Sequence, residues 1–106
     1  MNDRIQQLIK FLEEDPQDAF THYALALEYQ KTDKDKAKRT FENLVSQFPK
    51  YLPTYYAAAH LMIELNLPDD AENLFTKGIA LAKEQNNAKA RMELQSAYDM
   101  FMMDRD

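Results

Sequence analysis

The segment HYALALEYQK (residues 22–31) returns in similar form as YYAAAHLMIE (residues 55–64), and this repetition decides the fold. Both segments place small and large apolar residues at helical spacing, so both are predicted to be helices. They align without gaps at an offset of 33 residues. The matched positions are Tyr23 with Tyr56, Ala24 with Ala57 and Ala26 with Ala59.

A second set of matches extends the repetition into the helix that follows each segment. Ala37 and Phe41 correspond to Ala71 and Phe75, at an offset of 34 residues instead of 33. The one-residue difference between the two offsets falls in the turn between helices. A longer turn does not change which faces of the two helices pack together. We therefore predict two helical hairpins of one kind in tandem, which is a repeat architecture. Alanine is expected to let the two helices of each hairpin approach closely at Ala26, Ala37, Ala59 and Ala71.

Prolines and an aspartate mark where the helices begin and end. Pro16 and Pro49 each follow an apolar-periodic run, and both are expected to end helices because proline disfavours the α region at the preceding residue. Pro53 and Pro68 precede helical patterns, where the fixed φ of proline suits the first turn. Asp33 can cap a helix that begins at the next residue.

This punctuation and the spacing of apolar residues predict about six helices and no strand. The connections are short, so consecutive helices are expected to be antiparallel. The buried stripe of the first helix is predicted at Leu8, Phe11 and Leu12, and that of the third at Phe41, Leu44, Val45 and Phe48. The predicted ranges are 3–14, 18–31, 34–47, 53–65, 68–85 and 88–104.

Composition narrows the class of protein. A chain of 106 residues, 45% hydrophobic and 29% charged, is expected to form a single domain over residues 1–106. The formal net charge of −5 argues against nucleic acid and anionic lipid as partners. The chain has no cysteine, no long apolar run and no apolar signal segment, which predicts a cytoplasmic protein without a membrane partner.

Catalytic chemistry finds little support in the residue pattern. His60 and Glu64 lie at i and i+4 on one helix face, but two ligands do not make a metal site, and no HExxH occurs. Asp69 and Asp70 are explained by their position in a first helical turn. Gly78 is the one glycine and lies inside a predicted helix, so no phosphate loop is present. We predict that the chain is not an enzyme and holds no metal or cofactor.

The repeated pattern resembles the tetratricopeptide repeat family. That pattern of about 34 residues places an aromatic, a Leu-small pair and Tyr on helix A, then Ala, Phe and a small residue on helix B, and closes with Pro. Repeat 1, residues 19–51, matches at His22, Leu25, Ala26, Tyr29, Ala37, Phe41, Leu44 and Pro49. Repeat 2, residues 52–85, matches at Tyr55, Ala58, Ala59, Met62, Ala71, Phe75 and Gly78, with Lys83 in place of the closing Pro. The last helix of repeat 2 is therefore expected to be longer than usual.

The resemblance implies an all-α fold, a short right-handed superhelix of antiparallel helices that forms an α–α solenoid. Residues 3–14 resemble a lone helix B that caps one end, and residues 88–104 are expected to cap the other. Neither inter-helix turn contains glycine, a departure expected to matter little. The inward stripe of the C-terminal cap is predicted at Ala90, Leu94, Ala97, Tyr98 and Phe101.

The resemblance also implies a protein–protein interaction module, because the A helices of this family line a concave groove that binds peptides or partner helices. The side chains expected there are mostly apolar or aromatic, which favours an apolar or amphipathic segment of another protein. Family members that clamp an acidic C-terminus use Lys, Arg and Asn at these places, so that ligand is not expected. The predicted groove residues are Phe20, Tyr23, Leu27, Gln30, Lys50, Tyr51, Tyr56, His60 and Ile63.

Two alternatives stay open at the level of sequence. The last helix or a second copy of the chain could fill the groove, and the placement of that helix does not follow from the sequence. The chain could instead be a structural protein that forms a homodimer or larger homo-oligomer through its methionine-rich last helix, because methionine adapts to irregular partner surfaces. The contacts expected for that assembly are Met100, Phe101 and Met103.

Overall fold

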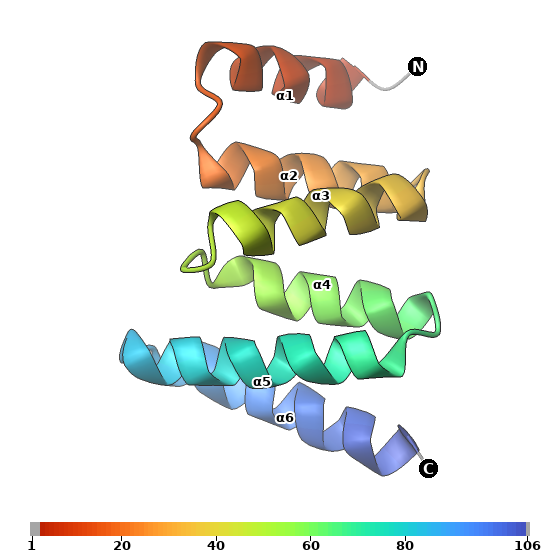
Figure 1. Ribbon diagram of the computed structural model, residues 1–106, viewed down its shortest axis with the longest axis vertical. Coiled ribbons are helices and arrows are strands. Elements are labelled where there is room, and N and C mark those ends of the chain that lie inside the picture. Colours follow the sequence, from red (N-terminus) through yellow and green to blue (C-terminus); the bar gives the residue numbers. More distant parts are fainter. Residues whose placement is uncertain (1–2, 106) are drawn as a thin grey trace. The chain divides into compact units, whose positions relative to one another are not determined.

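The computed structural model describes residues 3–105, which form six α-helices and no strand (Figure 1). The predicted all-α fold is confirmed, and each predicted helix end lies within one residue of the observed end. The helices are α1 (Asp3–Glu14), α2 (Ala19–Gln30), α3 (Lys34–Gln47), α4 (Pro53–Glu64), α5 (Pro68–Glu84) and α6 (Ala88–Arg105).

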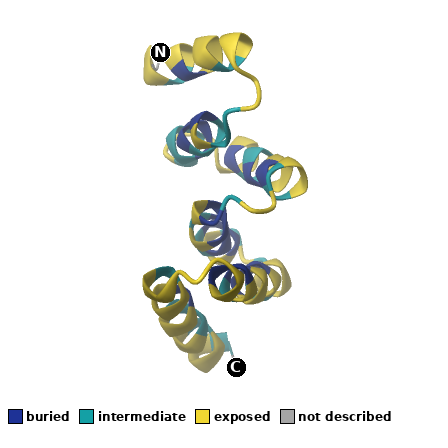
Figure 2. Ribbon diagram, turned by 90° about the vertical axis from the view of Figure 1, so that its left-hand side faces the viewer, coloured by how far each residue is buried: buried dark blue, intermediate teal, exposed yellow. Residues whose placement is uncertain are grey.

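The chain divides into two compact units, one that ends at Thr54 and one that begins at Tyr55. In the first unit, α2 packs against both α1 and α3. Ala26 of α2 and Ala37 of α3 are completely buried, as predicted. Phe41 and Leu44 of α3 are buried beside them. Figure 2 shows the buried residues of α2 and α3 gathered between these two helices, with exposed residues on their outer sides.

The buried stripe of α1 differs from the prediction at Phe11. Leu8 is buried against Ala24 and Leu25 of α2, with Ile5 and Leu12 packed beside it. The Phe11 side chain is 56% exposed, so its predicted burial is wrong. The reason is geometric: Ile5, Leu8 and Leu12 fall on one side of the helix, and Phe11 lies about 100° away from the centre of that stripe. Within its unit α1 packs on α2, which covers only the narrower stripe.

His22 occupies the aromatic position of the first repeat and behaves as an aromatic residue. Its ring lies 5.4 Å from the ring of Phe48, between centroids. Its Nε2 donates a hydrogen bond to the carbonyl oxygen of Pro16 at 2.9 Å. The ring therefore connects the first turns of α2 with Pro16, which follows α1, and with Phe48, which caps α3. This is a structural role.

The second unit contains α5 and α6, which pack against each other, and most of α4. Ala59 of α4 and Ala71 of α5 are completely buried, as predicted. Phe75 of α5 is also completely buried, and its ring lies 6.0 Å from that of His60 on α4. Helix α5 has 17 residues against 14 in α3, so the predicted extension past the missing proline is confirmed.

Side-chain and backbone caps define the helix ends. The carboxylate of Asp33 accepts a hydrogen bond from the backbone N–H of Lys36 at 3.1 Å, which confirms the predicted cap of α3. After α4, Asn66 takes a left-handed φ of 61°, and the N–H of Leu67 bonds to the carbonyl of Met62 at 2.8 Å. Asn86 repeats this arrangement after α5 with a φ of 55°. Asparagine thus replaces the glycine that commonly follows a helix in this conformation.

Candidate partner-binding site

The predicted groove residues of the first unit lie on α2 and in the loop that follows α3. Phe20 is exposed, whereas Tyr23, Leu27 and Gln30 are half-buried. The ring of Tyr23 meets that of Tyr51 edge to face, with centroids 5.8 Å apart. Burial raises the pKa of Tyr23. The pKa of Tyr51 is raised mainly by burial and, to a smaller extent, by the charges of Tyr23 and Asp18 nearby. The Lys50 side chain is exposed at this loop.

In the second unit, α4 presents Tyr56, His60 and Ile63 on one face. Their spacing of four and three residues places them in one row, because a helix turns once in 3.6 residues. The Tyr56 and His60 rings lie 4.5 Å apart between centroids. Tyr56 is 45% exposed and Ile63 is 39% exposed. Both keep a large apolar surface in contact with solvent although they belong to a helix that is otherwise well buried.

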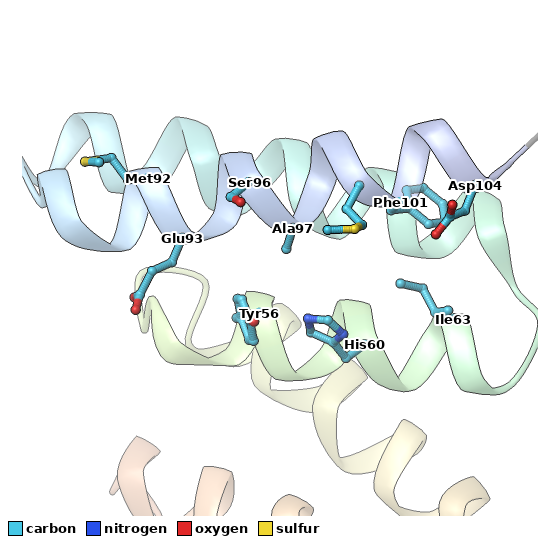
Figure 3. Close-up of a pocket in the computed structure, with 10 residues that line it drawn as sticks. Tyr56, His60, Ile63, Met92, Glu93, Ser96, Ala97, Phe101 and Asp104 are labelled. Carbon is cyan, nitrogen blue, oxygen red and sulfur yellow. The ribbon is translucent and has the colours of Figure 1, made fainter.

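A cleft of about 610 Å³ separates this row from α6 (Figure 3). Helix α6 packs on α5 and faces α4 across the cleft, so it does not cover the row of Tyr56, His60 and Ile63. The α6 wall is made of Met92, Glu93, Ser96, Ala97, Met100, Phe101 and Asp104.

Packing of aromatic rings behind the cleft holds its two walls in place. Phe75 of α5 contacts His60 of α4 on one side. On the other side, its ring lies 5.9 Å from Tyr98 and 5.7 Å from Phe101, both on α6. Of the predicted inward stripe of α6, Leu94 is buried and Tyr98 and Phe101 contact Phe75, whereas Ala97 lines the cleft. One phenylalanine therefore sets the separation of the two helices that form the cleft.

The charged groups that line the cleft are acidic. Glu93 and Asp104 are the charged side chains among the ten lining residues, and Lys and Arg are absent from that set. The Nε2 atom of His60 is buried and has no hydrogen-bond partner within residues 3–105. The cleft is therefore an apolar trough with a carboxylate toward each end.

Methionines continue the apolar surface of α6 to its C-terminal end. Met100 is 64% exposed and lines the cleft, and Met103 is 82% exposed. Phe101 is half-buried and contacts Phe75. The three residues predicted for an oligomer contact thus differ in their surroundings, and Met103 is the one most open to solvent.

The sequence reasoning missed the contribution of α6 to this face. It placed Ala97 and Phe101 inward but did not assign Met92, Glu93 or Ser96 to a site. The signal was present in the spacing, because positions 92, 96, 100 and 104 fall along one side of a helix. The spacing alone did not show that α4 lies opposite this side of α6.

Within the described residues, no group of His, Asp and Glu side chains is arranged to hold a metal ion. The histidines His22 and His60 are accounted for by ring contacts with Phe48, Tyr56 and Phe75. None of the helices between residues 3 and 105 combines the length and the apolar character that crossing a membrane requires.

Comparison with known proteins places the chain in a family. No protein-family model matches it, and no curated protein sequence matches it significantly. Solved structures do match it, and two of them are tetratricopeptide repeat domain proteins from Salinibacter ruber. The solution NMR structure is 41% identical with a TM-score of 0.78, and the match covers 82% of this chain and 89% of that one. The crystal structure is 38% identical with a TM-score of 0.76, and the match covers 80% of this chain and 97% of that one.

The chain belongs to the tetratricopeptide repeat family. Identity near 40% over most of both chains is sufficient for this assignment, and it agrees with the repeat pattern and the six helices. The fold is that of a helical solenoid, a class whose repeats stack to present extended binding surfaces. A general role in protein–protein interaction follows from that class.

Proposed function

We propose that this chain binds an apolar or amphipathic segment of another protein, and that the α4–α6 cleft holds that segment. The observation that carries the proposal is the exposed apolar row of Tyr56 and Ile63 opposite Met100. Large side chains of this kind leave water favourably when a partner covers them, and aromatic residues contribute strongly to binding energy at interfaces.

The shape of the cleft favours a rod-like ligand. Its walls are two helix faces joined by α5 behind, and they enclose an open trough of about 610 Å³. Apolar anchors at helical spacing are the usual means by which a groove holds an amphipathic helix. We assign no catalytic role to the cleft.

The proposal also includes the predicted groove residues of the first unit. Phe20 supports this, because its ring is exposed on α2. Tyr23 and Tyr51 contact each other and are half-buried, so their contribution is expected to be positional. Leu27, Gln30 and Lys50 remain predictions of a contact with the partner.

The test is peptide binding mapped onto the protein. Synthetic amphipathic helices are titrated into labelled protein, and amide NMR shifts are followed in α4 and α6. We expect shifts along the cleft and loss of binding in Tyr56→Ala with Ile63→Ala, while Lys77→Ala on exposed α5 surface serves as the control. Retained binding in a folded double variant would falsify the proposal.

A second candidate function is self-association through the end of α6. The observation that favours it is the 82% exposure of Met103 beside the exposed Met100. Sedimentation analysis over a wide range of protein concentration tests it. A dimer that Met103→Glu dissociates supports this function, and a chain that stays monomeric at high concentration excludes it.

A further inference from the structure

We propose that the segment bound in the α4–α6 cleft is a basic amphipathic helix of about three turns, with an apolar face and a Lys or Arg toward each end. This inference rests on the proposed function, and it names the chemistry of the partner.

The two carboxylates of the cleft fix the charge of the partner. Glu93 lies toward one end of the α6 wall and Asp104 toward the other (Figure 3). Neither forms an ion pair within residues 3–105. Arg105, next to Asp104 in the chain, is paired with Asp69 and Glu72 of α5. The cleft therefore keeps two uncompensated negative charges that a basic partner complements.

The separation of the carboxylates fixes the length. They are 11 positions apart on one helix, which at a rise of 1.5 Å per residue is about 16 Å along the axis. A bound helix that spans the same distance needs about three turns between its basic residues. Because both ends of the cleft are acidic, either chain direction of the ligand places a cation near each carboxylate.

The middle of the cleft calls for a large apolar side chain. Ser96 and Ala97 of α6 face Tyr56 and His60 of α4 there. Small residues on one wall leave room that a leucine or aromatic ring of the ligand would fill. Ile63 and Met100 extend the apolar surface toward the Asp104 end. A ligand that carries its basic residues toward its two ends and its apolar residues in the middle matches this arrangement of the cleft.

A helical ligand suits these walls better than an extended one. Helix faces offer no row of unpaired backbone donors and acceptors, so an extended peptide would lose hydrogen bonds to water without replacing them. A helix satisfies its own backbone and presents only side chains. The cleft is therefore expected to prefer helical peptides over extended ones of the same composition.

Three peptides of roughly 14 residues test the proposal. They share one apolar helical face and differ only in the residues toward both ends, which are Lys, Gln or Glu. Their affinities are measured by fluorescence anisotropy at low and high salt. The protein variants are Glu93→Gln with Asp104→Asn, and, as a control of equal net charge, Glu13→Gln with Glu84→Gln, two carboxylates outside the cleft.

We expect the order Lys, Gln, Glu from tightest to weakest. The Lys and Gln peptides should differ by roughly 2- to 30-fold at low salt, the range for two exposed ion pairs. High salt and the Glu93/Asp104 variant should both abolish the difference, and the Glu13/Glu84 control should retain it. Proline in the centre of the Lys peptide should remove binding, since it breaks the helix.

The outcomes separate this inference from the proposed function. Equal affinity for all three peptides, lost in Tyr56→Ala with Ile63→Ala, would leave the cleft as a binding site and overturn its preference for basic helices. A preference for the Glu peptide would overturn it as well. If no peptide binds, or if sedimentation shows a dimer that Tyr56→Ala with Ile63→Ala dissociates, the partner-binding proposal and this inference both fail.

Discussion

Gly78 is the residue at which three helices of the second unit come together. A Cβ atom built on it would lie 2.7 Å from Cβ of Tyr55 on α4 and 3.2 Å from Cδ1 of Leu94 on α6. The first of these neighbours is fixed to backbone and cannot rotate away. Position 78 is the small-residue position of the repeat. The 2.7 Å approach of Tyr55 Cβ is the physical reason that this position requires a small residue.

We predict that Gly78→Ala destabilises the protein. Alanine favours a helix interior over glycine by about 1 kcal/mol, but overpacking costs about 1 to 3 kcal/mol. The expected result is a lower unfolding midpoint in urea. Lys77→Ala, at an exposed position of the same helix, should stay within about 0.5 kcal/mol of the parent chain. A stabilised Gly78→Ala would show that the helices separate easily.

Asn66 ends α4 in a conformation that few residues adopt. Its left-handed φ of 61° allows the hydrogen bond from Leu67 to Met62 that closes the helix. Most side chains lose about 1 to 2 kcal/mol in that region, whereas glycine does not. We expect Asn66→Ala to lower the free energy of unfolding by about 1 kcal/mol and Asn66→Gly to preserve or raise it. Urea denaturation of both variants distinguishes these effects, and equal loss in both would instead point to a role of the amide side chain.

At the scale of the element, α6 is fastened to α5 at its C-terminal end by one side chain. Arg105 pairs with Asp69 and Glu72 near the start of α5, and its guanidinium lies 5.7 Å from the centroid of the Phe101 ring. The hydrogen bond to Asp69, followed by the charges of Asp69 and Glu72, raises the pKa of Arg105. Asp69 is exposed, which means that salt weakens its part of the contact.

Arg105→Gln is expected to loosen the last turn of α6 without unfolding the unit. The aromatic contacts of Phe75 with Tyr98 and Phe101 remain, so the global unfolding midpoint should change little. Amide hydrogen exchange should accelerate in the last turn of α6 and stay unchanged near Leu94. Uniform acceleration along the whole helix would mean that the ion pairs hold α6 as a unit.

At the scale of the whole molecule, buried phenols set the response to alkaline pH. Burial raises the pKa of Tyr23, Tyr51 and Tyr55 in the folded chain. In the unfolded chain these groups lose their protons near pH 10. The unfolded state therefore ionises first as the pH rises, and the stability that the neutral phenols contribute below about pH 10 is lost above it.

We predict a falling urea midpoint between about pH 9.5 and 11.5, where tyrosine ionises. Replacing Tyr23, Tyr51 and Tyr55 by Phe should flatten this decline, because phenylalanine carries no proton to lose. Replacing the exposed Tyr56 by Phe is the matched control and should leave the slope as it is. An identical slope in the triple variant would contradict the assignment of the alkaline loss to these three phenols.

Much of the architecture was predictable because it depends on residues close together in the chain. Prolines, the Asp33 cap and the 3.6-residue period act within one or two turns, and they placed every helix end within one residue. The alanines at 26, 37, 59 and 71 were recognised as close contacts because they recur at the repeat spacing, and all four are completely buried.

The face of a helix that is covered was harder to predict than the helix itself. Periodicity gave α1 a stripe that included Phe11, but the width of the stripe depends on how many neighbours α1 has. The same limit applied to α6, where Met92, Glu93 and Ser96 followed a helical row whose opposite wall was unknown. Charge on that row has meaning only once α4 lies across from it.

The sequence by itself determined six helices, two repeats and the alanine contacts between their helices, because these follow from local backbone preferences and a repeated spacing. Only the tertiary structure decided that α6 packs on α5 and leaves an acidic-ended apolar cleft opposite α4. The side chains that face each other across this cleft are about 40 positions apart in the sequence. Their approach is set by ring packing around Phe75, a contact that no local pattern encodes.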